Sequence, residues 1–365
     1  MVNTAEGERG MTASRYQGIV PSYLLDRLAR SDRFPHAARA ARQTLLGRPP
    51  AQRRAQLKLS IDEHGSLVAS VESAPDRTIR DAEGTETLPG VLVRSEGDAP
   101  VADIAVNQAY DGLGSTFQML LNAFDRNSVD GLGSRLDATV HYGSEYDNAF
   151  WDGERMVFGD GDGQVFQGFT ASLSVIGHEL GHGVIQHAGE LEYQGESGAL
   201  NESIADVFGA LTEQHSLDQT AADATWLIGA GIFTPSVKGV ALRSMLHPGT
   251  AYDDPDLGAD PQPADMSGFV RTSEDNGGVH INSGIPNRAF ALFARELGGR
   301  AWETAGGVWY RALSSGLRTN ATFSEFADAT LVEASKVDRT VVRALRTGWS
   351  TVGVIVGSEN ERTPG

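Results

Sequence analysis

The chain has 365 residues, of which 40% are hydrophobic, enough for a substantial core in two or three compact domains. It has no cysteine, which excludes disulfides, thiolate catalysis and cysteine-bound zinc. The net charge of −18 argues against nucleic acid as a partner, and no stretch approaches the roughly 18 apolar residues that a membrane helix needs.

The charge is unevenly divided along the chain. Residues 1–60 contain eleven Lys and Arg against four Asp and Glu, a net charge of +7, so the remainder carries −25. This division favours docking of a basic N-terminal arm on an acidic body. The first residues show no basic region followed by an apolar run, so we see no signal peptide. A cytoplasmic location and secretion by a non-classical route both stay open.

The arm is expected to contain two short helices. Residues 19–21 should be extended, because the residue before a proline avoids helix, and Ser22 is the expected cap of a first helix. The apolar face of that helix holds Leu24, Leu25 and Leu28. A second helix is expected over residues 35–46, ending at Gly47. The polar, proline-bearing stretch 48–54 is typical of a linker or an exposed cleavable segment.

The body changes character near residue 170. Before it, short alternating segments with Gly and Asp turns predict a β-rich region, with strands at 138–142 and 156–158 and one helix at 107–124. After it, the spacing of apolar residues predicts helices at 171–188, 198–214, 283–297, 301–315 and 321–336. We expect an α+β protein with a β-rich lobe at 57–189, a helical lobe at 190–356, an arm at 1–56 and a polar tail at 357–365.

The sequence His178-Glu179-Leu180-Gly181-His182 carries the first chemical signal. Positions four apart share one face of a helix, so both imidazoles can bind one zinc while Glu179 lies beside the metal-bound water. A buried helix that merely contains two histidines is the alternative. The motif alone does not decide between these interpretations.

The next predicted helix favours a zinc site. Glu202 and Asp206 are four residues apart and lie beside an apolar stripe, where acidic side chains need a partner. Glu202 as the third zinc ligand, and Asp206 as a hydrogen-bond acceptor for a ligand imidazole, would supply one. In the metzincin pattern the third histidine falls at position 188, which is Ala188, and His187 is one residue early. We therefore interpret His187 as a capping or surface residue.

At this point the sequence resembles the thermolysin family of zinc peptidases. Nineteen residues separate His182 from Glu202, which is the family's spacing. The resemblance extends from about Arg77 to the C-terminal region, with its motifs in the family's order. They lie at 147–151, 156–163, 178–182, 196–202, 242–245 and 275–284.

The resemblance implies a zinc-dependent endopeptidase with a two-lobed fold and its cleft between the lobes. Glu179 would be the general base, and Tyr193 and His280 would stabilise the oxyanion. Asp275 would orient His280 and favour its protonated form. On the same grounds, the substrate backbone would be held by Asn148, Ala149 and Arg243. An apolar pocket favouring cleavage before a bulky apolar residue would be lined by Phe166, Phe169, Val175, Ile228 and Leu242.

The sequence also departs from the family pattern. A paired calcium site that many members carry near the zinc helices keeps Glu213 but has Ser174 at another acidic position, so we expect that site to be missing, while calcium elsewhere stays open. The short arm is similar to the precursors of the protealysin subgroup, with Ser22 where a second proline is usual. It implies an autoinhibited precursor, and the family suggests secretion.

Two other functions were weighed against an endopeptidase. A catalytically silent binding protein would be favoured by loss of Glu179, Tyr193 or His280, and all three are present. An exopeptidase would need a group that captures a free chain terminus, and we find none in the sequence. We expect a monomer that acts on peptides or proteins and binds its own N-terminal propeptide.

Overall fold

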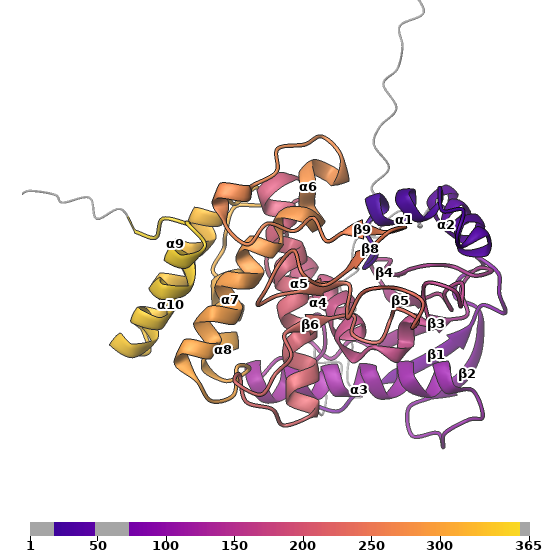
Figure 1. The fold of residues 1–365 in the computed structure, drawn as a ribbon. Helices are drawn as coiled ribbons and strands as arrows, with labels where there is room; N and C mark the ends of the chain where they lie inside the picture. The colour runs from indigo at the N-terminus through magenta and orange to yellow at the C-terminus, as the bar shows by residue number, and fades with distance from the viewer. Residues whose placement is uncertain (1–17, 48–72, 358–365) are drawn as a thin grey trace, which may run out of the picture.

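The structure is a computed structural model that describes residues 18–47 and 73–357. The predicted cleavable linker, the boundary between residues 56 and 57 and most of the polar tail lie outside these residues. The described chain forms a two-helix arm, a lobe built on a sheet and a helical lobe (Figure 1). The expected two-lobed α+β architecture is confirmed.

A five-stranded sheet organises the N-terminal lobe, in the order β2-β1-β3-β5-β4. The three central strands are parallel, and β2 and β4 pair antiparallel at the two edges. A tight turn joins β4 to β5: the Asp152 carboxylate accepts the Glu154 and Arg155 N–H groups, and Gly153 takes a φ of 101°. As an edge strand, β4 keeps one side open for pairing. The strands are β1 Arg77–Asp81, β2 Val91–Ser95, β3 Leu136–Val140, β4 Ala149–Trp151 and β5 Arg155–Phe158.

Two long helices back this sheet. Helix α3, Ile104–Phe124, begins three residues before its predicted start because the Asp103 carboxylate caps it, accepting the Val106 N–H at 3.1 Å. Helix α4, Leu173–Ala188, contains the two motif histidines and lies in the middle of the molecule, between the sheet and the C-terminal helices (Figure 1).

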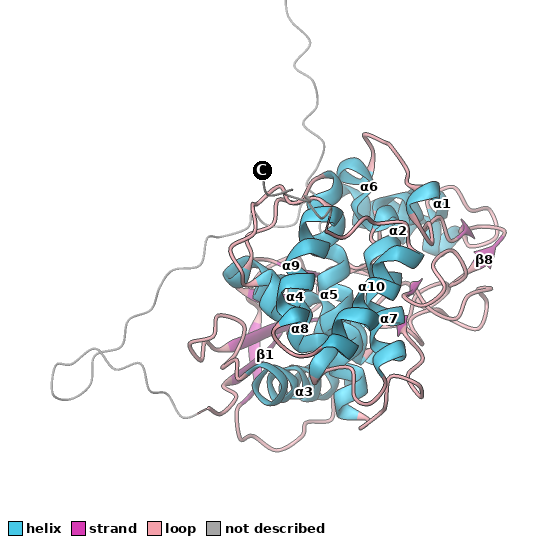
Figure 2. Cartoon of the chain, turned by 90° about the vertical axis from the view of Figure 1, so that its left-hand side faces the viewer, coloured by secondary structure: helices cyan, strands magenta, loops and turns pink. Residues whose placement is uncertain are grey.

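The C-terminal lobe is a packed group of helices (Figure 2). Sequence analysis missed α6, whose residues 276–278 have left-handed backbone angles, and α10, which Asp338 caps through the Thr340 and Val341 N–H groups. The core of the lobe includes Trp309 and Trp349, stacked with ring centroids 5.4 Å apart. The helices are α5 Gly195–Ser216, α6 Asp275–Asn282, α7 Gly284–Leu297, α8 Thr304–Leu313, α9 Phe323–Ser335 and α10 Arg339–Thr351.

Glycines allow α4 and α5 to pack unusually close together. A Cβ on Gly181 would lie 3.0 Å from the Ala205 Cα, and a Cβ on Gly209 would lie 2.3 Å from the Ser174 carbonyl oxygen. The backbones of the two helices therefore touch where larger residues would hold them apart. This contact brings the face of α4 that carries the histidines up to Glu202 on α5.

The arm consists of α1, Ser22–Leu28, and α2, Pro35–Leu46, and lies over the β4 edge (Figure 1). Ser22 is not the cap of α1, so that prediction is wrong: Pro21 occupies the N-cap position, and no side chain caps the helix. The predicted apolar face is confirmed, since its three leucines are at most 1% exposed. Helix α2 ends before Gly47, as expected.

Short elements complete the fold around the cleft. They are the two-stranded pairs β6 Leu227–Ile228 with β7 Arg243–Ser244 and β8 Asp253–Asp254 with β9 Gly258–Ala259, and the 3-10 turns η1 Phe169–Ala171 and η2 Met266–Gly268. Among the described residues, no helix is both long and apolar enough to span a membrane.

His141 joins α3 to the loop after β5 and makes a pH-dependent contribution to stability. Its ring nitrogens lie 2.9 Å from carboxylate oxygens of Asp103 and Asp160. Burial alone lowers the pKa of His141, but the two carboxylates outweigh it and raise the pKa. The stabilisation is therefore full below the unfolded pKa of about 6.5 and is lost as pH rises through the folded pKa.

We predict that His141→Asn lowers the free energy of unfolding by about 1 kcal/mol at pH 6 and by less at pH 9. Asn is chosen because it tolerates the φ of 53° at this position. Urea unfolding at both pH values measures the effect, with the exposed His187→Asn as control. A larger loss at pH 9 would contradict the assigned ion pairs.

Candidate active site

Three side chains from α4 and α5 converge in the middle of the molecule. The Nε2 atoms of His178 and His182 are 3.1 Å apart, and carboxylate oxygens of Glu202 lie 3.6 and 3.5 Å from them, respectively. These three residues form the one group of this kind, among the described residues, whose ligand atoms could hold a metal ion. The predicted ligand set is brought together by the α4–α5 contact.

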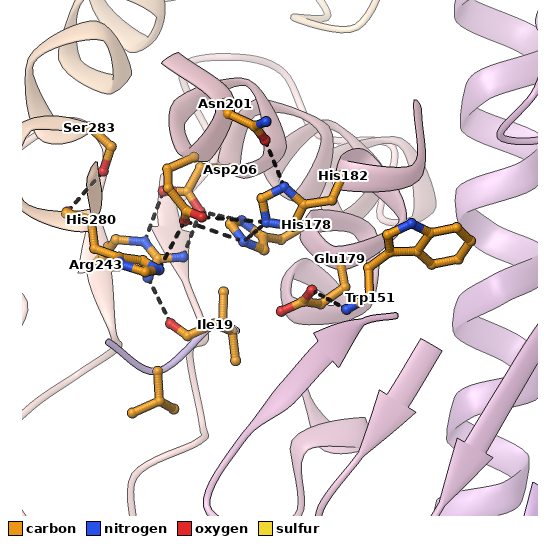
Figure 3. A network of polar contacts seen from close by, with 12 residues as sticks. Ile19, Trp151, His178, Glu179, His182, Asn201, Asp206, Arg243, His280 and Ser283 are labelled. Atoms are coloured by element: carbon orange, nitrogen blue, oxygen red, sulfur yellow. Dashed lines mark hydrogen bonds and ion pairs between the residues drawn. The ribbon is translucent and has the colours of Figure 1, made fainter. Parts of the chain in front are cut away.

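Hydrogen bonds at the far side of each ring fix which nitrogen carries the proton. His178 Nδ1 donates to Asp206 at 2.7 Å, and His182 Nδ1 donates to the Asn201 Oδ1 at 2.8 Å (Figure 3). The Asn201 amide is oriented because its Nδ2 donates to the Leu191 carbonyl. Both Nε2 atoms therefore present lone pairs to each other.

This arrangement fits a bound cation. Burial, above all, lowers the pKa of both His178 and His182 to about 4, so both rings are neutral near pH 7. The Glu202 Oε2 is buried and has no hydrogen-bond partner among the described residues. Three lone pairs facing each other without a proton repel, and a cation removes the repulsion. Two imidazole nitrogens and one carboxylate form a donor set typical of zinc with an open position.

Glu179 lies beside this group, one residue after His178 on α4. Its Oε2 accepts the backbone N–H of Trp151 at 3.0 Å, and its Oε1 has no partner among the described residues (Figure 3). Burial, followed by the charge of Glu202, raises the pKa of Glu179. A cation at the three ligands would oppose this shift by favouring the ionised carboxylate.

Tyr193, His280 and Asp275 form a second group against Glu202. The Tyr193 hydroxyl donates to Glu202 and lies 3.2 Å from His280 Nε2. His280 Nδ1 lies 2.6 Å from Asp275, whose second oxygen accepts the His280 backbone N–H. Burial alone lowers the pKa of His280, but Glu202 and Asp275 outweigh it and raise the pKa to about 9. His280 is therefore a charged hydrogen-bond donor near pH 7.

Asp206 connects the histidines to Arg243. The Arg243 guanidinium donates through Nε and Nη2 to the Asp206 carboxylate, at 2.9 and 2.8 Å. Asn287 donates to the same carboxylate at 2.8 Å. Burial alone would raise the pKa of Asp206, but Arg243 and His178 hold it well below its usual range. Asp206 is therefore ionised and can only accept the proton of His178.

The open edge of β4 is occupied by the arm. The Ile19 N–H donates to the Ala149 carbonyl at 3.1 Å, and the Asn148 side chain exchanges two hydrogen bonds with the Val20 backbone. Arg243 Nη1 donates to the Ile19 carbonyl at 2.9 Å (Figure 3). The three residues expected to hold a substrate backbone thus hold a backbone here, and it belongs to the arm.

The five residues predicted to line an apolar pocket are all buried, with at most 3% exposure. Phe166 and Phe169 have ring centroids 5.8 Å apart, and the Leu242 N–H donates to the Ile228 carbonyl. Val175 lies on the first turn of α4. Their role as pocket walls remains a prediction. His187 is exposed near the end of α4, which agrees with its interpretation as a surface residue.

Sequence analysis missed three groups that complete the site. Asn201 orients His182, Asn287 binds Asp206, and the Trp151 backbone N–H binds Glu179. Asn201 could have been suggested by its place next to Glu202, whereas Asn287 lies on α7 and gives no sequence signal. A backbone N–H carries no sequence signal at all.

Family models match almost the whole body of the chain. A model described as "Thermolysin metallopeptidase, catalytic domain" matches residues 66–186, and "Thermolysin metallopeptidase, alpha-helical domain" matches residues 189–354. The chain belongs to the thermolysin family. It is a metalloendopeptidase of that family, and the similarity predicted from its motifs is confirmed.

Relatives of similar length share the arm as well as the body. An "Extracellular metalloprotease" of Pectobacterium carotovorum subsp. carotovorum is 46% identical over 93% of this chain and 97% of its own. "Protease PrtS" of a Photorhabdus species is 44% identical, with 95% of each chain covered. The solved precursor of protealysin from Serratia proteamaculans matches with a TM-score of 0.84 and 46% identity, over 93% of this chain and 100% of its own. These similarities support membership of the protealysin subgroup of the thermolysin family.

We predict that Asp206→Asn lowers zinc affinity by about 10- to 100-fold, because the charged acceptor that holds the His178 proton is replaced by a neutral amide. It should also cost about 3 kcal/mol of stability, since Arg243 is left as an uncompensated buried charge. Asn287→Ala removes another contact to Asp206 but leaves the contact with His178, and should change zinc affinity less than threefold. Competition with a zinc chelator measures both. If both variants lost zinc affinity equally, Asp206 would have no specific role in metal binding.

Proposed function

We propose that the chain binds one zinc through His178, His182 and Glu202 and hydrolyses peptide bonds with Glu179 as general base. The observation that carries the proposal is that ligand atoms of His178, His182 and Glu202 converge beside Glu179. The Oε1 of Glu179 is buried and has no hydrogen-bond partner among the described residues. A zinc bound there would polarise the substrate carbonyl and lower the pKa of a bound water.

The protein's own groups would then move the proton and stabilise charge. Glu179 takes the proton of the attacking water and delivers it to the leaving amine. His280 and Tyr193 donate hydrogen bonds to the oxygen on which negative charge develops. The Asp275 carboxylate, 2.6 Å from His280 Nδ1, supports this role because it favours the doubly protonated ring. Asp275 holds the ring in position.

The substrate backbone would pair with the β4 edge. Asn148 and Ala149 supply hydrogen bonds on one side, and Arg243 binds the carbonyl of the first residue after the cleaved bond. The five buried apolar residues around Val175 and Leu242 would then accept the side chain of that residue. This favours cleavage before Leu, Phe, Ile or Val.

We further propose that residues 1–56 form an inhibitory propeptide on a catalytic body divided into lobes 57–189 and 190–356. The described part of the arm contacts both lobes: Arg33 lies 3.5 and 3.4 Å from Asp254 and Asp256, and the Ala37 N–H donates to Gln164. The arm also occupies the β4 edge that a substrate needs. Cleavage in the 48–60 stretch would allow its release.

Three finer assignments complete the proposal. The paired calcium site is absent, which is supported by the Ser174 hydroxyl bonding both Glu213 and the Gly229 N–H where the family has carboxylates. The enzyme is a monomer that contacts neither nucleic acid nor membrane. It is secreted, which the "Extracellular" in a relative's name supports.

Removal of metal tests the proposal directly. Dialysis against a chelator should abolish hydrolysis of an unstructured protein, and one equivalent of zinc per chain should restore it. Calcium alone should restore nothing, because the ligand set contains two nitrogens. Full activity in protein shown by elemental analysis to lack metal would end this assignment.

Substitution of Glu179 separates metal binding from chemistry. Glu179→Gln should keep the fold and one zinc per chain but lose at least about a hundredfold in kcat, as expected when a general base is removed. The comparison variant is Glu213→Gln, which lies on α5 away from the ligands and should stay within about threefold of wild type. If Glu179→Gln kept the normal kcat, Glu179 would not be the general base.

Substitution of Arg33, which forms ion pairs with the body, tests whether docking of the arm inhibits the enzyme. Arg33→Ala removes contacts to Asp254, Asp256 and the Ser236 carbonyl, and should raise the activity of the full-length chain several-fold. Arg39→Ala is the matched control, because Arg39 is exposed and bonds His36 within the arm. Activity is measured before processing and compared with intact mass. If full-length and processed chains are equally active, the arm is no inhibitor.

A further inference from the structure

The arm enters the active site in the register of a substrate. Val20 is bound through both its N–H and its carbonyl by Asn148, and the Ile19 carbonyl is bound by Arg243 (Figure 3). The proposed role of Arg243 is to hold the carbonyl of the first residue after the cleaved bond. By that assignment Ile19 occupies the first position on the leaving side, and the reacting bond is Gly18–Ile19.

The surroundings of Ile19 agree with this register. Its backbone N–H donates to the Ala149 carbonyl at 3.1 Å, on the same edge strand whose Trp151 N–H binds Glu179. Its side chain is completely buried. Isoleucine is also one of the residue types that the proposed pocket favours.

Gly18 fits its position because it has no side chain. A Cβ there would lie 2.8 Å from the Ala149 carbonyl oxygen and 2.9 Å from the Asn148 amide. A larger residue would push this part of the arm away from β4. Pro21, which has no N–H, is the third residue after this bond and occupies the N-cap position of α1. It therefore does not remove the N–H at the reacting bond.

We propose that the Gly18–Ile19 bond is a self-cleavage site, cut within the same folded chain before the arm leaves. This inference rests on the proposed function. Water adds to the Gly18 carbonyl carbon, the bond from that carbon to the Ile19 nitrogen breaks, and Gly18 gains a carboxylate. Glu179 takes a proton from the water and passes it to the Ile19 nitrogen, and the proton left on the new Gly18 carboxyl group follows it, so that the carboxylate forms as Ile19 becomes an ammonium N-terminus.

The cut by itself would not free the cleft. Residues 19–47 remain attached through the Arg33 ion pairs, the Ser31 contact with Asp256 and the buried face of α1. The new amine stays opposite Glu179, so the shortened chain is a product-inhibited enzyme. Activity would rise only after a second cut in the linker and release of both helices.

Intact mass and N-terminal sequencing of the zinc-loaded full-length chain test the proposal. Wild type should lose residues 1–18 at a rate independent of protein concentration, with little gain in activity, and expose Ile19. Glu179→Gln should keep residues 1–18. When processed wild-type enzyme is added to Glu179→Gln, the linker should be cut while the buried Gly18–Ile19 bond stays intact.

Substitutions at residue 19 test the register. Ile19→Leu should be cut within about threefold of the wild-type rate, whereas Ile19→Asp, which places a charge in an apolar pocket, should slow the cut at least about a hundredfold. Unchanged cutting of Ile19→Asp would overturn the register. Loss of residues 1–18 from Glu179→Gln at the wild-type rate would overturn self-cleavage.

The activity of the arm-free enzyme distinguishes failure of the self-cleavage inference from failure of the proposed function. If wild type keeps residues 1–18 until the arm is lost, and the arm-free enzyme hydrolyses an unstructured protein, the self-cleavage inference is wrong and the proposed function stands. If the arm-free, zinc-loaded enzyme hydrolyses no protein, the proposed function fails, and this inference fails with it.

Discussion

The contact between α4 and α5 is the constraint on which the site depends. Gly181 and Gly209 let the two backbones touch: a Cβ on Gly209 would lie 2.3 Å from the Ser174 carbonyl oxygen, which is too close, and a Cβ on Gly181 would make a tight contact with Ala205. At this separation the two imidazole nitrogens, 3.1 Å apart on one helix, lie 3.6 and 3.5 Å from carboxylate oxygens on the other, close enough to bind one cation. Helix–helix packing, usually a matter of stability, here sets the geometry of the ligands.

Charged side chains surround the contact between α4 and α5. Asp206, one turn after Glu202, is held ionised by Arg243 and orients His178, while Arg243 uses its remaining nitrogen on the backbone in the cleft. A buried ion pair of this kind is costly to break, because the group left behind is an unpaired charge in a dry interior. The same pair therefore links metal binding, backbone recognition and stability of the C-terminal lobe.

The arm uses the recognition features that an extended peptide would use. It pairs with an edge strand and gives a carbonyl to Arg243, and it then leaves the cleft as helix α1, which no extended substrate would do. Within the part of the arm that the structure describes, Arg33 pairs with Asp254 and Asp256, and His36 lies 2.9 Å from Glu145. The described interface also includes the buried leucine face of α1 and the backbone hydrogen bonds in the cleft.

The sequence by itself determined which candidate ligands lie together, because spacing on a helix fixes which side chains share a face. His178 with His182, and Glu202 with Asp206, follow from a four-residue repeat that any α-helix obeys. The extents of most long helices and the apolar face of α1 follow from the same periodicity. The predicted cap of α1 was wrong. Ser22 is a residue type that commonly caps helices, but the helix begins at Ser22 itself, and Pro21 is its N-cap residue.

Only the tertiary structure decided which groups complete the site. Asn201, Asn287 and the Trp151 N–H come from different elements, and nothing local marks them as partners of His182, Asp206 and Glu179. The register of the arm is likewise set by Asn148 and Arg243, which lie 128 and 224 residues away from their partners along the chain. Such pairings depend on how elements pack, and packing is a property of the whole chain that no short pattern encodes.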